Sequence, residues 1–318
     1  MNKTKQDYLQ EVLETHRMSH IETLTNKYRT KRREVKEKLE NNYANKVYSP
    51  MNSGSFAKHT SINIKFDLDT IVPFKKNSFD TLEKMFDDVF EFLSKEYGTV
   101  AVVRKQTVSI GIIFYQDSDG DEINLDIVPG REQNQDKYKD DKNLNLFVNS
   151  KYGILDKQTY IKTNIQTQID HIKAKENERK IIRLLKIWKN SNRENYKSFL
   201  LELITIKAFH KEDISGNLWE KLKAVMTYIK NNVTQEGFTI KDPGNSSNNV
   251  IDTLESYERQ ALSDKMDRII KNIESNEDNI KMYFPTNKDY EEKSSQEGYG
   301  MKTASVSASI PPNNTRFG

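Results

Sequence analysis

The 318-residue chain can bury one large core or form two lobes, and its net charge of only +3 gives no argument from charge alone for nucleic-acid binding. It has no cysteine, no apolar run of the ~20 residues that span a bilayer, and no apolar signal segment at its N-terminus. We therefore expect a cytoplasmic protein without membrane contact, disulfide bonds or cysteine-bound metal.

The first predicted element is a long amphipathic helix. Apolar and aromatic residues recur at mainly helical spacing from about Tyr8 to Leu39, and neither Pro nor Gly interrupts them. A coiled-coil arm is the alternative interpretation. It is the weaker one because the repeat is short and irregular.

A tight turn follows at Ser53-Gly54-Ser55. Glycine allows such a turn to close, so that a backbone N–H and the Ser55 hydroxyl can face phosphate oxygens. Lys58 would add a point charge nearby. Gly54, Ser55 and Lys58 are therefore candidate phosphate-binding residues, although most Gly-Ser pairs are ordinary turns.

Residues 62–72 predict a strand that stops at Pro73. Side chains two apart on a strand share a face, so Asp67 and Asp69 would point the same way. A third carboxylate, Asp126, lies in the apolar run 123–128. If this second strand pairs beside the first, the three carboxylates form one cluster.

Three bare carboxylates in one place repel each other, and burying them unpaired costs several kcal/mol. Magnesium removes this conflict because it prefers oxygen ligands and keeps water and phosphates in its shell. Two such ions about 3.5–4 Å apart can activate a hydroxyl and neutralise leaving pyrophosphate. Asp67, Asp69 and Asp126 are thus candidate catalytic residues and ligands of two Mg²⁺ ions, with Mn²⁺ as a substitute.

The remaining pattern predicts an α+β protein. A helix over 79–97 precedes strands at 99–104 and 107–115, and Asp117 to Asp121 predicts a hairpin turn whose spacing does not fit an EF-hand. From about residue 159 the chain is mainly helical, whereas after about 285 it is rich in Ser, Asn, Thr and Gly, which predicts a flexible tail. The main C-terminal helices are expected near 181–189, 200–209, 218–229 and 254–273.

Three segments together resemble the polymerase-β-like nucleotidyltransferases. They are Gly54 to Thr60, Asp67 to Phe74 and Leu125 to Pro129. Within that superfamily, the chain is most similar to the branch that contains oligoadenylate synthases, cyclic GMP-AMP synthase and the bacterial antiphage (CBASS) enzymes, the CD-NTases. The resemblance covers roughly residues 45 to 255 and extends to the blocks 182–189, 196–203 and 241–250.

The resemblance implies a nucleotidyltransferase lobe at residues 1–165, with a mixed sheet and a long N-terminal spine helix. A helical lobe at 166–285 and a flexible tail at 286–318 would follow. By position, Lys186 and Ser198 correspond to residues that hold the donor triphosphate, and Asp242 and Asn249 to a stretch that closes near the nucleotide. One departure is His59, where many relatives have glycine.

The function implied is condensation of NTPs into a cyclic or short linear oligonucleotide second messenger, in antiphage signalling. One alternative is transfer of nucleotides to RNA or protein, and another is an inactive nucleotide-binding scaffold. Some relatives are joined through a C-terminal glycine to other proteins by a ubiquitin-transfer-like partner, and Gly318 is a candidate for that linkage. Local basic runs leave nucleic-acid contact open, but without cysteine the zinc module of the animal enzyme is excluded.

Overall fold

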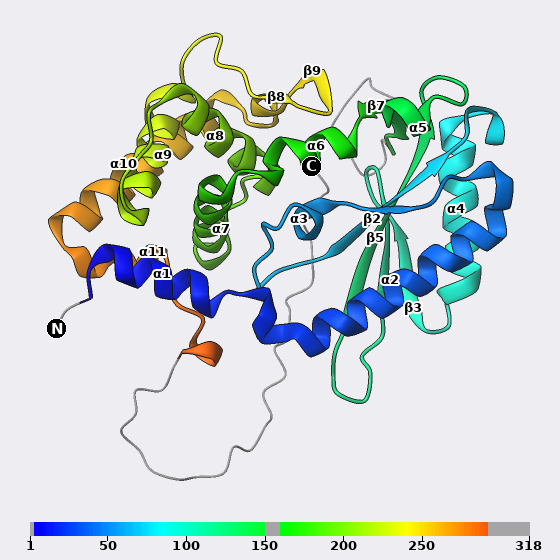
Figure 1. Cartoon of the computed structure of the whole chain (residues 1–318), viewed down its shortest axis with the longest axis horizontal. Coiled ribbons are helices and arrows are strands. Elements are labelled where there is room, and N and C mark those ends of the chain that lie inside the picture. The colour runs from blue at the N-terminus through cyan, green and yellow to red at the C-terminus, as the bar shows by residue number, and fades with distance from the viewer. Residues whose placement is uncertain (1–2, 150–159, 292–318) are drawn as a thin grey trace.

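The computed structural model describes residues 3–149 and 160–291. It places a mixed sheet with its covering helices at one end of the molecule and a bundle of helices at the other (Figure 1). The α+β class is therefore confirmed. Within the described ranges, no helix combines the length and apolar character needed to cross a membrane. Gly318 and most of the expected tail lie outside the described residues.

The sheet has seven strands among the described residues, in the order β1-β2-β5-β4-β3, with β6 on β5 and β7 on β6. Strands β2 and β5 pair in parallel, and the other pairs are antiparallel. Their bounds are β1 Met51–Asn52, β2 Leu68–Phe74, β3 Ala101–Lys105, β4 Ile110–Phe114, β5 Ile123–Glu132, β6 Leu144–Phe147 and β7 Tyr160–Thr163.

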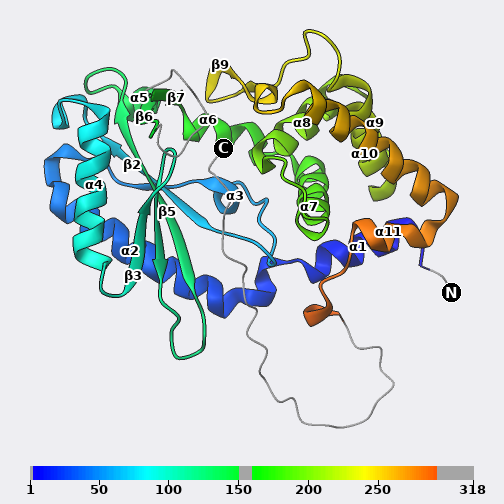
Figure 2. The same ribbon diagram turned by 180° about the vertical axis from the view of Figure 1, so that it is seen from behind.

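Helices α2 (Glu22–Tyr43) and α4 (Leu82–Tyr97) cover one face of this sheet, as both views of the ribbon show (Figures 1 and 2). Leu68 of β2 and Leu125 of β5 are buried in the core beneath them. Because side chains alternate across a strand, the next residues, Asp69 and Asp126, point to the opposite face. The sheet thus separates an apolar core from an acidic face.

The N-terminal spine is helical as expected, but it is interrupted. It consists of α1 (Lys5–Thr15), a 3-10 turn (Met18–Ile21) and α2. At the break, the Asn63 side chain donates to the Thr15 carbonyl at 2.9 Å, and the Asn63 N–H donates to the His16 carbonyl at 3.2 Å. These tertiary bonds replace intrahelical ones, which is why a sequence without Pro or Gly can still bend there.

The prediction of a strand over 62–72 is wrong at both ends. Ile62 is buried against the helical bundle, and the Lys65 N–H donates to its carbonyl in a tight turn, so β2 begins only at Leu68. Pro73 lies inside β2. Its carbonyl accepts from the Tyr48 N–H at 2.8 Å. Since both backbone groups of a strand residue point to the same side, its missing N–H faces away from β5 and costs no bond there.

The helical bundle has its own core, to which α1 contributes Leu9 and Val12. A hairpin of β8 (Lys241–Asp242) and β9 (Asn245–Asn249) lies on the sheet side of this bundle, near α6 (Figure 1). The bundle helices are α6 Ile165–Lys173, α7 Glu176–Ser191, α8 Ser198–Lys211, α9 Leu218–Asn232, α10 Ser256–Ser275 and α11 Ile280–Tyr283. Two single-turn helices, α3 (Gly54–Ala57) and α5 (Tyr138–Asp141), belong to the sheet end.

Candidate active site

The three carboxylates expected to cluster do lie together. Asp69 of β2 and Asp126 of β5 are register partners in the parallel pair, and Asp67 lies one residue before β2. Each of the three offers an oxygen, and these oxygens all lie within 4.8 Å of one another. Asp69 is only 4% exposed. The backbone pairing of β2 with β5 therefore sets the distance between Asp69 and Asp126.

Burial and mutual repulsion disfavour the charged forms of these acids. Burial raises the pKa of Asp69 well above its ordinary value, and the charges of Asp67 and Asp126 raise it further. Burial and the Asp67 charge raise the pKa of Asp126 to about 7, against the opposing effect of a hydrogen bond from Gln106. No Lys or Arg of the described residues forms an ion pair with these three carboxylates. With all three acids ionised, the cluster would have excess negative charge, which a divalent cation would neutralise.

Gly54 brings the loop of α3 against this acidic face. Its φ is +69°, and a Cβ placed there would lie 1.5 Å from Oδ2 of Asp69. The Ser53 N–H donates to the Asp69 carbonyl at 3.0 Å, which fixes the loop to β2. The Ser55 hydroxyl is 2.9 Å from that of Ser61. Only glycine fits at position 54, in agreement with the tight turn predicted there from the sequence.

Two lysines of α7 lie over the same region. Lys186 donates to the Thr60 carbonyl and hydroxyl at 3.1 Å, and it is 6% exposed. Lys189, one turn later, donates to Ser198 Oγ at 3.2 Å. Burial lowers the pKa of each lysine to about 8. The structure thus places Lys189, and not Lys186, in hydrogen-bond contact with Ser198. The sequence analysis did not single out Lys189 because it has the pattern of a solvated helix face.

Lys58, the residue after α3, is paired with a residue of the helical bundle. Its ammonium donates to Glu202 of α8 at 2.8 Å, with side chains 7% and 5% exposed, and it lies 4.4 Å from the centre of the Phe199 ring. A role in phosphate binding stays a prediction. In the structure, its charge is neutralised within a buried ion pair that connects the α3 loop to the helical bundle.

Asp242 and Asn249 stabilise the β8–β9 hairpin. Asp242 Oδ1 accepts from the Gly244 N–H at 2.8 Å and from Gln168 of α6 at 3.0 Å. Asn249 Oδ1 accepts from the Ile240 N–H at 2.7 Å. These bonds give both side chains a structural role, and their contact with a nucleotide stays a prediction.

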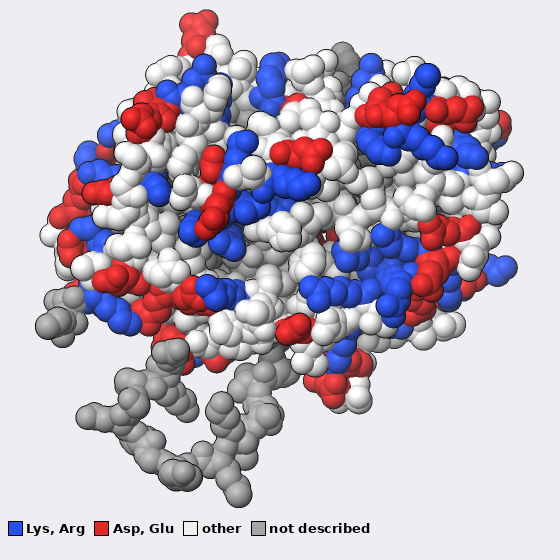
Figure 3. All heavy atoms as spheres, in the orientation of Figure 1, with Lys and Arg blue, Asp and Glu red and all other residues white. Residues whose placement is uncertain are grey.

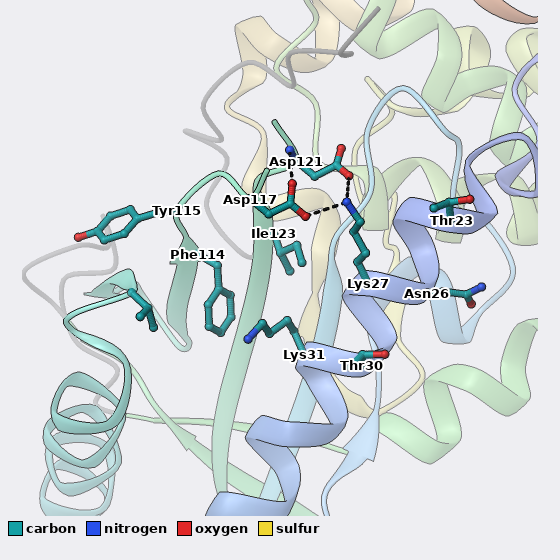
Figure 4. A pocket seen from close by; sticks show the side chains of 11 residues that line it. Thr23, Asn26, Lys27, Thr30, Lys31, Phe114, Tyr115, Asp117, Asp121 and Ile123 are labelled. Carbon is teal, nitrogen blue, oxygen red and sulfur yellow. Dashed lines mark hydrogen bonds and ion pairs between the residues drawn. The ribbon is translucent and has the colours of Figure 1, made fainter. Parts of the chain in front are cut away.

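A separate pocket of about 510 Å³ lies between α2 and the hairpin that joins β4 to β5. Phe114 and Ile123 form part of its wall, and Lys27 forms ion pairs with Asp117 and Asp121 beside it (Figure 4). The hairpin turn predicted from the sequence is confirmed here. Asp67, Asp69 and Asp126 do not line this pocket, so it is distinct from the candidate active site.

Comparisons with known proteins give a consistent result at the level of fold. No family model and no curated protein matches the sequence. Among solved structures, CdnC of E. coli MS115-1 with ATP matches with a TM-score of 0.62 and 22% identity, over 82% of this chain and 87% of that one. The CD-NTase CdnG of Bradyrhizobium diazoefficiens, with GTP, matches with a TM-score of 0.64 and 14% identity, over 87% and 94%.

A third match is DncV of Vibrio cholerae, described as a cyclic AMP-GMP synthase and a prokaryotic cGAS homolog. Its TM-score is 0.56 and its identity 15%, over 74% of this chain and 68% of that one. At these identities the similarity is one of fold. The chain therefore has the fold of the cGAS-like CD-NTases, as the sequence resemblance implied.

Proposed function

We propose that the chain is a nucleotidyltransferase that condenses NTPs into a cyclic or short linear oligonucleotide. The observation that carries this proposal is the cluster of Asp67, Asp69 and Asp126 directly beside the Gly54 loop, where Asp69 leaves no room for a Cβ. The matching structures contain ATP and GTP, and one of them is a cyclic AMP-GMP synthase. These facts support an NTP substrate.

The donor atoms of the cluster fit divalent cations, because all are carboxylate oxygens and none has an ammonium or guanidinium partner among the described residues. Asp67, Asp69 and Asp126 would hold two Mg²⁺ ions, or Mn²⁺ in their place. When bound, such ions supply the positive charge that favours a deprotonated acceptor hydroxyl and a leaving pyrophosphate.

The other residues would position the substrates. Ser55, Lys186 and Ser198 would hold the donor triphosphate, with the Lys186 ammonium already directed at the loop through Thr60. The acceptor ribose hydroxyl loses its proton to solvent water and its oxygen attacks the α-phosphorus in line. A new P–O bond forms, and the bond to the leaving pyrophosphate breaks. Catalysis then depends mainly on orientation and charge neutralisation by this chain's own groups.

The direct test is to incubate the protein with labelled NTPs and Mg²⁺ or Mn²⁺, and to resolve the products by phosphatase and nuclease treatment. A phosphatase-resistant oligonucleotide is expected. Label on RNA or on protein would instead favour the alternative transferase, and no transfer would favour a scaffold. On the face shown in Figure 3, basic and acidic side chains of the described residues are interspersed, which favours a small acceptor over RNA.

The double variant Asp67→Asn/Asp69→Asn should abolish product. It should also raise the melting temperature of the metal-free protein, because it removes two charges that burial disfavours. Calorimetry and product analysis would check both effects. Retained synthesis by a folded double variant would contradict the assignment of these acids. An antiphage role would follow from the resemblance and needs a phage-challenge assay in cells.

A further inference from the structure

Gln106 contacts the candidate active site although no sequence motif includes it. It lies in the turn between β3 and β4, where its Nε2 donates to Asp126 Oδ1 at 3.1 Å. Asp126 Oδ2 accepts no hydrogen bond from the described residues. Gln106, Asp126 and Asp67 line the same narrow hollow. The amide therefore holds one oxygen of the carboxylate and leaves the other available.

The orientation of this amide is fixed by Ser109. The Ser109 hydroxyl donates to Gln106 Oε1 at 2.7 Å, so the amide is held by its oxygen while its Nε2 donates to the Asp126 carboxylate. The Gln106 N–H donates to the Ser109 carbonyl at 2.8 Å and closes the turn. Ser109 is fully buried. The hydrogen bonds from Ser109 through Gln106 to Asp126 thus start from a buried residue of the turn between β3 and β4.

Gly111 provides the space for this contact. It lies opposite Asp126 in the β4–β5 register, and a Cβ at this position would lie 2.6 Å from Gln106 Nε2. Glycine in a strand normally weakens it and often marks a close approach. Here the group that approaches most closely is the Gln106 amide, and the Arg104 side chain lies 3.4 Å from the same Cβ position. A glycine, a buried serine and a glutamine therefore form one arrangement directed at a single carboxylate.

We propose that Gln106 is a positioning residue that holds the Asp126 carboxylate in its orientation toward Asp67 and Asp69, an inference that rests on the proposed two-metal function. The amide donates a hydrogen bond without adding a charge of its own. The Arg104 side chain lines the same hollow, and its positive charge already lowers the pKa of Asp126. Partners of this kind commonly fix the orientation of metal-binding side chains. The turn itself is closed by a backbone bond, so the side chain is not needed to form it.

The test measures divalent-cation binding directly, without nucleotide. Mn²⁺ is titrated into the full chain and free Mn²⁺ is followed by electron paramagnetic resonance. Gln106→Leu keeps the volume but removes the donor, and it should weaken Mn²⁺ binding by about 10–100-fold. The matched control is Ser94→Ala in α4, whose hydroxyl is buried without a hydrogen-bond partner among the described residues, and it should bind Mn²⁺ like the wild type.

A second variant keeps the proposal testable if Gln106→Leu does not fold. Ser109→Ala keeps the amide but frees it to rotate, so its Mn²⁺ affinity should lie between those of the wild type and Gln106→Leu. In turnover assays both variants should lower kcat while the KM for NTP stays within twofold. Raising Mn²⁺ should restore part of the lost rate, because a weakened site can still be saturated.

Wild-type Mn²⁺ affinity in both variants would overturn the positioning role. So would a wild-type protein whose Mn²⁺ binding is absent or is unchanged by Asp126→Asn. If the wild type binds Mn²⁺ through Asp126 but makes no oligonucleotide, the proposed function fails, while the affinities of the two variants still decide the role of Gln106.

Discussion

At the scale of single residues, the candidate site depends on positions where a side chain would not fit. Gly54 combines a left-handed backbone with direct contact to Asp69. Gly237, in the turn after α9, has a similar φ of +74°, but nothing lies within 4 Å of the Cβ that it lacks. Replacing each glycine by alanine therefore distinguishes the free-energy cost of the left-handed backbone, which both positions share, from the cost of the Cβ clash, which only Gly54 has.

Gly54→Ala should abolish NTP turnover and lower stability by more than the ~1–2 kcal/mol that a left-handed conformation costs an ordinary residue. Gly237→Ala should show only the backbone cost and keep full activity. Chemical denaturation and initial rates would check both variants. Equal stability losses with full activity in Gly54→Ala would show that the α3 loop can move away from Asp69.

The raised pKa of Asp126 predicts a pH-dependent stability difference in the metal-free protein. Because the pKa of Asp126 is about 7 in the folded protein and near its ordinary value of 3.8 in the unfolded chain, protonation stabilises the fold. That contribution is complete below about pH 4 and is lost as the pH rises to about 7. Asp126→Asn should therefore be more stable than the wild type above pH 7.

This advantage of Asp126→Asn should disappear as the pH falls toward 4, as measured by melting temperature in a chelator. Adding Mg²⁺ at pH 8 should raise the melting temperature of the wild type more than that of the variant. A difference between the two proteins that does not change with pH would show that Asp126 is not protonated in the fold.

At the scale of elements, the α3 loop is tied to the helical bundle by the Lys58–Glu202 pair. Both side chains are buried, so removing one partner leaves a charge uncompensated. Glu202→Gln should cost about 3–5 kcal/mol in unfolding free energy. Lys58→Met/Glu202→Leu should recover most of this loss, as urea denaturation would show.

The same double variant tests the predicted phosphate contact of Lys58. An unchanged KM for NTP would mean that Lys58 has a structural role, whereas a raised KM would support the prediction from the sequence. A Glu202→Gln variant as stable as the wild type would mean that Lys58 finds another partner or is neutral in the fold.

Helices and strands were predicted correctly from the sequence where the residues with the expected apolar periodicity are also the ones buried in the nearest core. Alternation correctly placed Asp67 and Asp69 together, although Asp67 lies one residue before the buried strand β2. It placed the strand start six residues early, because Ile62 alternates like a strand residue but packs on the helical bundle. Gln106 and Lys189 were missed for a related reason. Gln106 contacts Asp126 of β5 and Lys189 contacts Ser198 at the start of α8, and a single sequence contains no record of such contacts between elements.

At the scale of the whole molecule, the N-terminal spine contacts both ends of the structure. α1 packs in the helical bundle and α2 on the sheet. The break between them is bridged by Asn63, whose side chain donates to Thr15 and accepts from Asn287 at 3.2 Å. One amide thus joins the spine, the segment before β2 and the C-terminal part of the described chain.

Asn63→Ala should lower the unfolding free energy by about 1–3 kcal/mol, because it leaves the Thr15 carbonyl without this donor. Asn287→Ala should cost less, since its side-chain bond is longer and its backbone N–H still donates to Thr15 Oγ1 at 3.0 Å. Denaturant titrations of the two variants would test this order. The reverse order would place the main anchor of the break at Asn287.

The parallel pairing of β2 with β5 also determines which changes in chain length this architecture tolerates. Since Asp69 and Asp126 are opposite each other in the ladder, their spacing follows from the distance of about 4.8 Å between neighbouring strands. Insertions in the connecting segments leave that spacing intact, however long they are. Deletion of one residue within β2 or β5 would instead reverse the side-chain alternation and point Asp69 or Asp126 into the apolar core under α2 and α4.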